Sequence, residues 1–222
     1  MTVNPIVNVK TMIKNESCTV LMMNDVTGEG IMTVYQVMPG VMICFSDMHM
    51  EKCDSEFELQ KDKKVLCIDH CREGRIEMEV QPGVFSIMQE NELRLDNREN
   101  HKGTTYYPLR HYHGVSVFMD VEETQKALDT MFLGFSVDIA QLRMRYCTQD
   151  KPYVIRNDEG LSRIISSFYR RNMERPEILA SKEYYQIKVV EMLLYLETMT
   201  TTILAPIVTP ILSWWLAGAW ID

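Results

Sequence analysis

The stretch that decides the fold is KVLCIDHCREGRIEMEV, residues 64–80. Its two apolar runs, 64–70 and 75–80, alternate apolar with polar side chains in the manner of half-buried strands. Between them, Glu73-Gly74 is typical of a turn, because glycine adopts the positive φ angles that two-residue hairpin turns need. The stretch therefore predicts a β-hairpin with an exposed turn at residues 72–75.

Further β-type runs surround this hairpin. They are short, rich in β-branched and aromatic residues, and separated by turn signals such as Pro39-Gly40 and Pro82-Gly83. Several short strands at such spacing predict an all-β barrel or sandwich. The runs are 31–37, 41–50, 84–88, 92–97 and 113–121.

The pattern changes after residue 120, where apolar residues recur with helical spacing. Asp120 and Glu123 have the spacing of a capping box that opens a helix. A second helix is predicted over 159–171 and a third after Ser181. The third has a wide apolar band, which predicts packing against a partner helix, for example from a second copy of the chain. The sequence thus predicts an α+β fold, a mainly antiparallel barrel followed by C-terminal α-helices.

Length and composition set the broad class of the protein. The chain has 222 residues, 46% of them hydrophobic and 24% charged, which is ordinary for one folded domain with an extension. The formal net charge of −8 leaves no basic surplus for phosphates, so we expect no direct nucleic-acid binding by this chain. The six cysteines are dispersed and the N-terminus lacks the apolar core of a secretory signal. These features predict a reduced, cytoplasmic protein.

Histidines in the predicted strands are the leading candidates for contacts to a ligand. His111 and His113 are two residues apart, so their side chains share one face of a strand. The same parity argument places His70 on the apolar face of its own strand, which we expect to line the barrel interior. Asp47 and His49 are weaker candidates for the same polar lining.

Six motifs, in order, resemble the N-terminal sensor region of a group of AraC-type (AraC/XylS) transcription regulators. The similarity runs from about residue 28 to residue 199. The resemblance implies a cupin-like double-stranded β-helix, or jelly-roll, barrel that binds a small effector and is followed by helices that mediate dimerisation. The motifs are SDMHMEKCDSEF (46–57), CIDHCREGRIEMEV (67–80), PGVFSIM (82–88), LDNRENHKG (95–103), YPLRHYHGVSV (107–117) and GFSVDI (134–139).

The HxH pair also raises the alternative of a stand-alone metal-dependent cupin enzyme, with His70, His111 and His113 as metal ligands. Metal-binding cupin barrels place a glutamate about four residues after such a pair, yet Val117 stands there and no histidine follows residue 113. Cys71 beside His70 is not a nucleophile–base pair, because neighbours on a strand point to opposite faces. We therefore expect no metal, no cofactor and no catalytic residue.

The resemblance ends at LLYLETM (193–199), where the family continues into a helix-turn-helix domain that reads DNA. This chain continues with TTTILAPIVTPILSWWLAGAWID (200–222), which carries no charge before its last residue. We interpret this tail first as the product of a shifted reading frame or a truncated gene, and second as an apolar helix packed on the domain. A membrane anchor ranks third, because Pro206 and Pro210 would interrupt a spanning helix.

These observations predict an effector-binding barrel over 1–120, a helical dimerisation region over 121–199 and an atypical tail over 200–222. The expected function is small-molecule sensing by a module that forms a homodimer or pairs with a full-length relative. DNA would be reached only through a domain that this chain does not carry. The alternatives are the metal-dependent enzyme and a sensor tethered to a membrane through 200–221.

Overall fold

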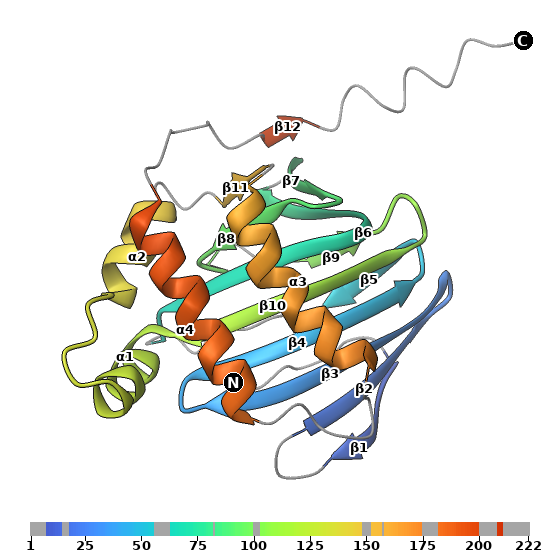
Figure 1. The fold of residues 1–222 in the computed structure, drawn as a ribbon. Coiled ribbons are helices and arrows are strands. Elements are labelled where there is room, and N and C mark those ends of the chain that lie inside the picture. The colour runs from blue at the N-terminus through green and yellow to red at the C-terminus, as the bar shows by residue number, and fades with distance from the viewer. Residues whose placement is uncertain are drawn as a thin grey trace, which may run out of the picture.

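The computed structural model of the chain describes residues 8–14, 18–55, 63–81, 83–99, 103–147, 152–156, 158–174, 182–199 and 208–210. Within them the chain forms strands and then helices, with the short strand β11 between α2 and α3 and the short strand β12 after α4 (Figure 1). The strands are β1 (Asn8–Lys14), β2 (Cys18–Asp25), β3 (Gly28–Met38), β4 (Val41–His49), β5 (Lys52–Ser55), β6 (Val65–Gln81), β7 (Val84–Gln89), β8 (Leu93–Asp96), β9 (Gly103–Tyr106), β10 (Tyr112–Asp120), β11 (Tyr153–Ile155) and β12 (Val208–Pro210). The helices are α1 (Val121–Met131), α2 (Ile139–Tyr146), α3 (Glu159–Glu174) and α4 (Lys182–Thr198).

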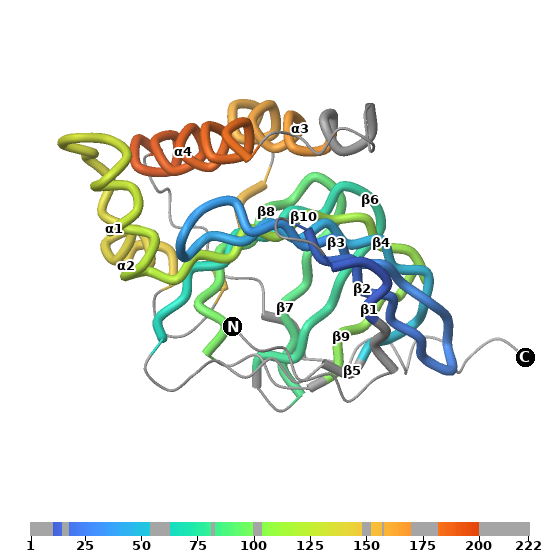
Figure 2. The backbone as a smooth tube through the Cα atoms, turned by 90° about the horizontal axis from the view of Figure 1, so that it is seen from below, coloured from blue at the N-terminus to red at the C-terminus, as the bar shows by residue number. Residues whose placement is uncertain are grey.

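The strands form one curled antiparallel sheet. Its main path is β1-β2-β3-β4-β10-β6-β7-β12, and β5, β8, β9 and β11 pair beside this path. Seen end-on, the sheet bends round so that β5, β7 and β9 lie across from β3, β4 and β10 (Figure 2). The result is an antiparallel half-barrel with mostly C-terminal helices, so the predicted α+β, cupin-like fold class is confirmed.

The helices α3 and α4 cover the outer face of the curled sheet, over β3, β4 and β10 (Figures 1 and 2). A large hydrophobic cluster fills the space between the two layers, and most of its helical members are fully buried. Phe45 of β4, for example, packs its ring against Tyr169 of α3 and Tyr185 of α4, with ring centroids 6.1 Å apart in both pairs. The main core of the protein therefore lies between sheet and helices.

A second hydrophobic cluster lies inside the curl. It joins the two sides of the half-barrel and is rich in methionine, whose flexible side chain fills irregular space. Its buried members are Met23, Met48, Met50, Cys53, Cys71, Ile76, Met78, Met88, Tyr107 and Tyr112, with Met32 packed against them.

The predicted hairpin over residues 64–80 is wrong, because β6 runs through it without a turn. The first half of β6 pairs with β8 and β10, and the second half pairs with β7 and β9. Gly74 has φ +88°, and a Cβ atom there would lie 2.0 Å from the carbonyl oxygen of His111. Glycine is thus needed to bend one long strand across the curl, where the sequence pattern suggested a chain reversal.

Other predicted elements are mostly found. Asp120 caps α1, and its carboxylate accepts a hydrogen bond of 2.9 Å from the backbone N–H of Glu123. The elements that were not predicted lie outside the runs that the periodicity picked out; they are the strands β1, β2, β5, β9, β11 and β12 and the helix α2. The predicted cap at Ser181 and the tail 200–222, apart from β12, lie outside the described residues.

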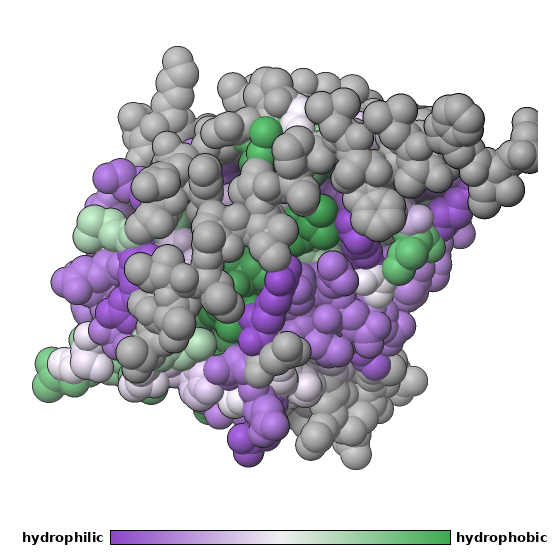
Figure 3. All heavy atoms as spheres, turned by 90° about the horizontal axis from the view of Figure 1, so that it is seen from above, coloured by the Kyte–Doolittle hydropathy of each residue, from purple (hydrophilic) through white to green (hydrophobic). Residues whose placement is uncertain are grey.

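The described surface carries many charged groups, as the composition predicts. Seen from above the view of Figure 1, it is largely hydrophilic, with a hydrophobic patch near the centre (Figure 3). Of the helices in the described ranges, none combines the length and apolar character needed to cross a bilayer.

Gly74→Ala tests whether β6 depends on this glycine. We expect it to destabilise the protein by more than Gly83→Ala, because both positions have a positive φ but Gly83 has nothing within 4 Å of an added Cβ. The control measures backbone strain alone, about 1–2 kcal/mol, and the difference measures the clash with the His111 carbonyl. Urea unfolding of both variants gives the two values; equal losses would contradict the close approach.

Candidate functional site

His70 faces the helices and not the barrel interior. Its Nδ1 atom lies 2.9 Å from the hydroxyl oxygen of Tyr169 on α3. The Tyr169 hydroxyl also donates a hydrogen bond of 3.3 Å to the backbone carbonyl of His70. Burial and the nearby Arg72 lower the pKa of His70 from 6.5 to about 4, so the imidazole is neutral at pH 7 and forms part of the contact between sheet and helix.

The prediction that the apolar face of the strands lines the interior is therefore wrong. Val115 and Phe45, opposite each other on β10 and β4, belong to the cluster under the helices. His113 and Asp47 are opposite each other two residues further along, so they share this outer face. The parity argument correctly identified which residues share a strand face. It assigned that face to the interior, whereas the face is apolar because α3 and α4 pack on the outside of the sheet.

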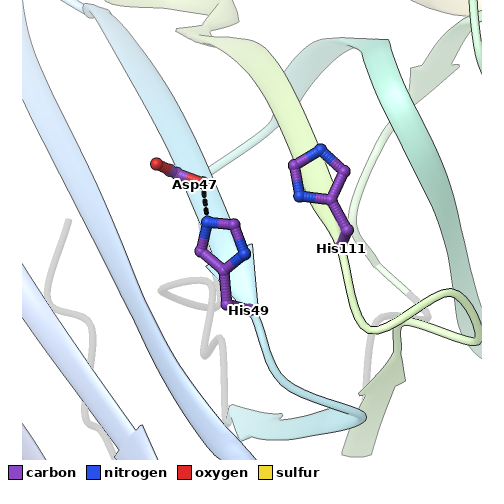
Figure 4. Close-up of side chains that lie close together, drawn as sticks. All are labelled: Asp47, His49 and His111. Carbon is purple, nitrogen blue, oxygen red and sulfur yellow. Dashed lines mark ion pairs between the residues drawn. The ribbon is translucent and has the colours of Figure 1, made fainter.

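Four of the five predicted site residues come together on this outer face, at one end of β4 and β10. Figure 4 shows Asp47 and His49 on β4 beside His111, which precedes β10. Asp47 Oδ1 lies 2.9 Å from His49 Nε2 and 3.2 Å from His113 Nε2. The rings of His49 and His111 have their centroids 5.1 Å apart.

Glu73 is the fifth member of this group, and the sequence analysis missed it. Its Oε2 atom lies 3.3 Å from His111 Nε2 and 4.0 Å from His113 Nδ1. We call Asp47, His49, Glu73, His111 and His113 the histidine–carboxylate cluster. The predicted hairpin had placed Glu73 in an exposed turn.

A β-bulge brings Glu73 into the histidine–carboxylate cluster. On β6, Cys71 pairs with Gly114 of β10, but Glu73 pairs with His113, so Arg72 is an extra residue. Without this bulge, alternation from the outward-facing His70 would turn Glu73 to the interior. Periodicity gives no signal for a bulge of one residue.

The interior contains a second polar group, centred on Asp69. This carboxylate accepts hydrogen bonds of 2.7 Å from Nη2 of Arg94 and from Nη2 of Arg98, and one of 2.6 Å from the hydroxyl of Ser116. Arg94 is 1% exposed and Asp69 is also 1% exposed. Arg98 has φ +57° and also contacts Asp96, 3.4 Å from its Nη1. We call these five residues the Asp69 network.

The charges of the Asp69 network stabilise one another. Burial alone would raise the pKa of Asp69, but Arg98 and Arg94 outweigh it and hold this pKa well below its usual value. Burial would likewise lower the pKa of Arg98, yet Asp69 raises it. Asp69 and Arg98 thus remain ionised inside the sheet.

One donor of the Asp69 network has no hydrogen-bond partner among the residues that the structure describes. Nη1 of Arg94 is buried and makes no hydrogen bond with any of the described residues. A buried guanidinium donor without an acceptor is costly, and native proteins usually satisfy it with water, an ion or a ligand. The position of Arg94 beside Met78 of the interior cluster is therefore a place for an acceptor atom.

The buried cysteines are poor nucleophiles. Burial raises the pKa of Cys71 to about 12, with Glu90 and Glu92 adding to the effect. Burial also raises the pKa of Cys44 and of Cys147 to about 12. These thiols stay protonated at neutral pH, and the thiolate is the reactive form.

Asp69→Asn tests the Asp69 network. The substitution removes the carboxylate that both guanidinium groups share and leaves Arg98 only its longer contact with Asp96, so we expect a loss of about 3–5 kcal/mol in the free energy of unfolding. Glu122→Gln, which removes an exposed ion pair with Lys126, is the control and should cost less than about 0.5 kcal/mol.

The pH dependence of unfolding in the wild type and in Asp69→Asn tests whether the charge of Asp69 causes this loss of stability. Because the pKa of Asp69 is lower in the folded than in the unfolded state, its contribution is present above about pH 4 and is lost as the pH falls further. Urea unfolding at several pH values should show the difference between wild type and Asp69→Asn shrinking below pH 4. A difference independent of pH would mean that packing, and not charge, causes the loss.

Among known proteins, solved structures match the chain at low sequence identity. No protein-family model and no curated protein matches the chain. A crystal structure of ToxT from Vibrio cholerae O395 aligns with a TM-score of 0.38 and 11% identity, over 74% of this chain and 56% of that chain. A second ToxT structure from Vibrio cholerae has a TM-score of 0.38 and 12% identity, over 70% and 56%. Vicilin from Capsicum annuum has a TM-score of 0.27 and 12% identity, over 74% and 50%. The chain thus spans about half the length of these proteins.

Proposed function

We propose that this chain is the small-molecule-sensing and dimerisation module of an AraC-type transcription regulator. One observation carries the proposal. Asp69 and His70 are neighbours on β6, and Asp69 belongs to the interior network while His70 is bonded to Tyr169 of α3. A molecule that contacts the interior network therefore acts on a strand that also holds the helical layer. The AraC-type part of the proposal rests on the six sequence motifs.

The interior suits an effector with an apolar body and a hydrogen-bond acceptor. Nη1 of Arg94, which has no hydrogen-bond partner in the described ranges, supplies the donor. Methionines of the interior cluster supply an adaptable apolar surface. An acceptor on the effector would complete the Asp69 network. Its differential affinity for two arrangements of the sheet and α3 would bias the position of the helices.

The helical layer offers a surface for dimerisation. On α4, Ile187 is 61% exposed and Leu194 is 42% exposed, and their spacing of seven residues places them on the same side of the helix. The opposite side of α4 is buried on the sheet through residues such as Val189 and Leu193. A second copy of the chain could bury Ile187 and Leu194.

DNA contact and catalysis are not assigned to this chain. Its net charge of −8 gives no electrostatic attraction to phosphates, so a basic domain of another chain or segment would have to supply DNA binding. We further propose that the module is not an enzyme, in keeping with its protonated buried thiols.

Effector binding can be tested with panels of aliphatic acids, aromatic acids and sugars. We expect at least one compound to raise the melting temperature of the purified chain, because ligands that bind only the folded state stabilise it. Met32→Trp places a larger side chain against the interior cluster and should weaken the binding of that compound at least about tenfold in a calorimetric titration, a loss of about 1.4 kcal/mol.

Met144→Trp is the matched control, because Met144 lies on α2 and is 62% exposed. It should leave the affinity unchanged. A panel without any binder, or a binder that Met32→Trp does not affect, would argue against an effector in the interior.

Dimerisation can be tested separately by light scattering after size-exclusion chromatography. The wild-type chain should have the mass of a dimer, and Ile187→Glu/Leu194→Glu should have that of a monomer, since two buried carboxylates would oppose association. Lys182→Glu, at an exposed position of the same helix, should remain dimeric. A monomeric wild type, or a double variant that still dimerises, would rule out this face.

A further inference from the structure

We propose that the histidine–carboxylate cluster binds one divalent transition-metal ion, of which Zn²⁺ is the best fit. The site consists of His49, His111 and His113 with Asp47 and Glu73, drawn from three neighbouring strands and the segment before β10. It lies on the outer face of the sheet, on the opposite side from the Asp69 network. It does not depend on the proposed effector.

The spacing of the side chains matches that of metal ligands. Two ligand atoms about 2.1 Å from a tetrahedral zinc ion are about 3.4 Å apart. In the cluster, Asp47 lies 2.9 Å from His49 and 3.2 Å from His113, and Glu73 lies 3.3 Å from His111. Three pairs therefore already have the separation of ligands that share an ion.

His111 joins the two halves of the cluster. It belongs to a triad with Asp47 and His49 and to a second triad with Glu73 and His113, and the ligand atoms within each triad lie within 4.8 Å of one another. Small rotamer changes would bring the members of either triad around one centre. A single ion that uses His111 would take its remaining ligands from the other four residues.

Charge and hydrogen bonding also favour an ion. Two carboxylates and three neutral imidazoles would give a divalent cation an overall neutral site, and zinc binds this donor set well. Asp47 Oδ1 is buried and forms no aligned hydrogen bond within the described part of the chain, although two imidazole nitrogens lie within 3.2 Å of it. This oxygen therefore has a lone pair available to coordinate an ion, and imidazole nitrogens that could bind the same ion lie beside it.

The site is open to solvent but not fully exposed. The side chains of His111 and His113 are 35% and 36% exposed, and those of Asp47 and Glu73 are 42% and 46% exposed. An ion could enter directly from solution and keep a water molecule as a further ligand. Bound metal would link β4, β6 and the start of β10.

The arrangement differs from the one the HxH pair suggested. An interior ion held by His70, His111 and His113 does not fit the geometry, because His70 is bonded to Tyr169 and belongs to neither group of potential metal ligands among the described residues. Its place is taken by Asp47, His49 and Glu73. Glu73 reaches the cluster only through the bulge at Arg72.

Cobalt and zinc titrations of the full chain test the site. The protein is prepared without a polyhistidine tag, stripped of metal with a chelator and titrated with Co²⁺, whose visible spectrum reports its ligands, and then with Zn²⁺. We expect one equivalent of Co²⁺ with nitrogen and oxygen ligands, displaced by Zn²⁺, and a higher melting temperature for the zinc-bound protein.

Three variants locate the ion. His111→Ala removes the ligand common to both triads, and Glu73→Gln removes a carboxylate with little change of shape; each should weaken Zn²⁺ binding at least about tenfold. Glu51→Gln is the matched control, because Glu51 is an exposed carboxylate paired with Arg110 outside the cluster. It should leave Zn²⁺ affinity unchanged. Circular dichroism establishes that each variant is folded.

Each result decides for or against the proposal. One equivalent of metal that is lost in His111→Ala or Glu73→Gln, and kept in Glu51→Gln, supports it. The wild-type spectrum alone can overturn it, since a thiolate-to-cobalt charge-transfer band would place the ion on cysteine. Failure of the folded wild type to bind a stoichiometric ion, or unchanged affinity in both cluster variants, would overturn it as well.

Discussion

The charge of Asp69 ties together the middle of the sheet. Its carboxylate, 1% exposed, is held by Arg94 from β8, by Arg98 just after β8 and by Ser116 from β10. An ionised group at such depth is tolerated only with its partners in place. The relative positions of β6, β8 and β10 are therefore linked, and β10 is also one of the strands that α3 and α4 cover. The next residue on β6, His70, is hydrogen-bonded to Tyr169, so the position of β6 is linked to that of α3.

The outer face of the sheet has two parts with different chemistry. Under α3 and α4 it is apolar, and beyond Tyr169 it is polar and carries the histidine–carboxylate cluster. Arg72 lies between the two parts, because its guanidinium carbon is 5.2 Å from the centre of the Tyr169 ring and its Nε atom is 3.3 Å from Glu73. A metal that took Glu73 as a ligand would compete with Arg72. Tyr169 of α3 is thus connected to the interior network through His70 and to the histidine–carboxylate cluster through Arg72.

Sequence periodicity predicted the fold class and much of the candidate site. Alternation identified the central strands, the Asp120–Glu123 spacing identified the start of α1, and the HxH spacing correctly placed His111 beside His113. The errors have local causes. Gly74 has the positive φ of a turn residue but serves to bend one continuous strand, and parity cannot tell which face of a sheet is covered by helices.

Ion pairs between residues far apart in the sequence could not be predicted either. Asp69 and Arg98 are 29 residues apart in sequence yet meet inside the sheet, and no spacing rule connects them. Glu73 entered the cluster through a bulge that shifts the register by one residue. Both features depend on how strands pair, which the pattern of a single strand does not determine.

The most direct test of the link through β6 is hydrogen exchange in Ser116→Ala, measured by mass spectrometry against the wild type. The substitution removes one hydrogen bond to Asp69 from the interior side and touches neither α3 nor His70. If β6 couples the two faces, amides of α3 near Tyr169 should exchange faster while those of α1 keep their wild-type rates. Faster exchange confined to β6, β8 and β10, with α3 unchanged, would contradict the coupling.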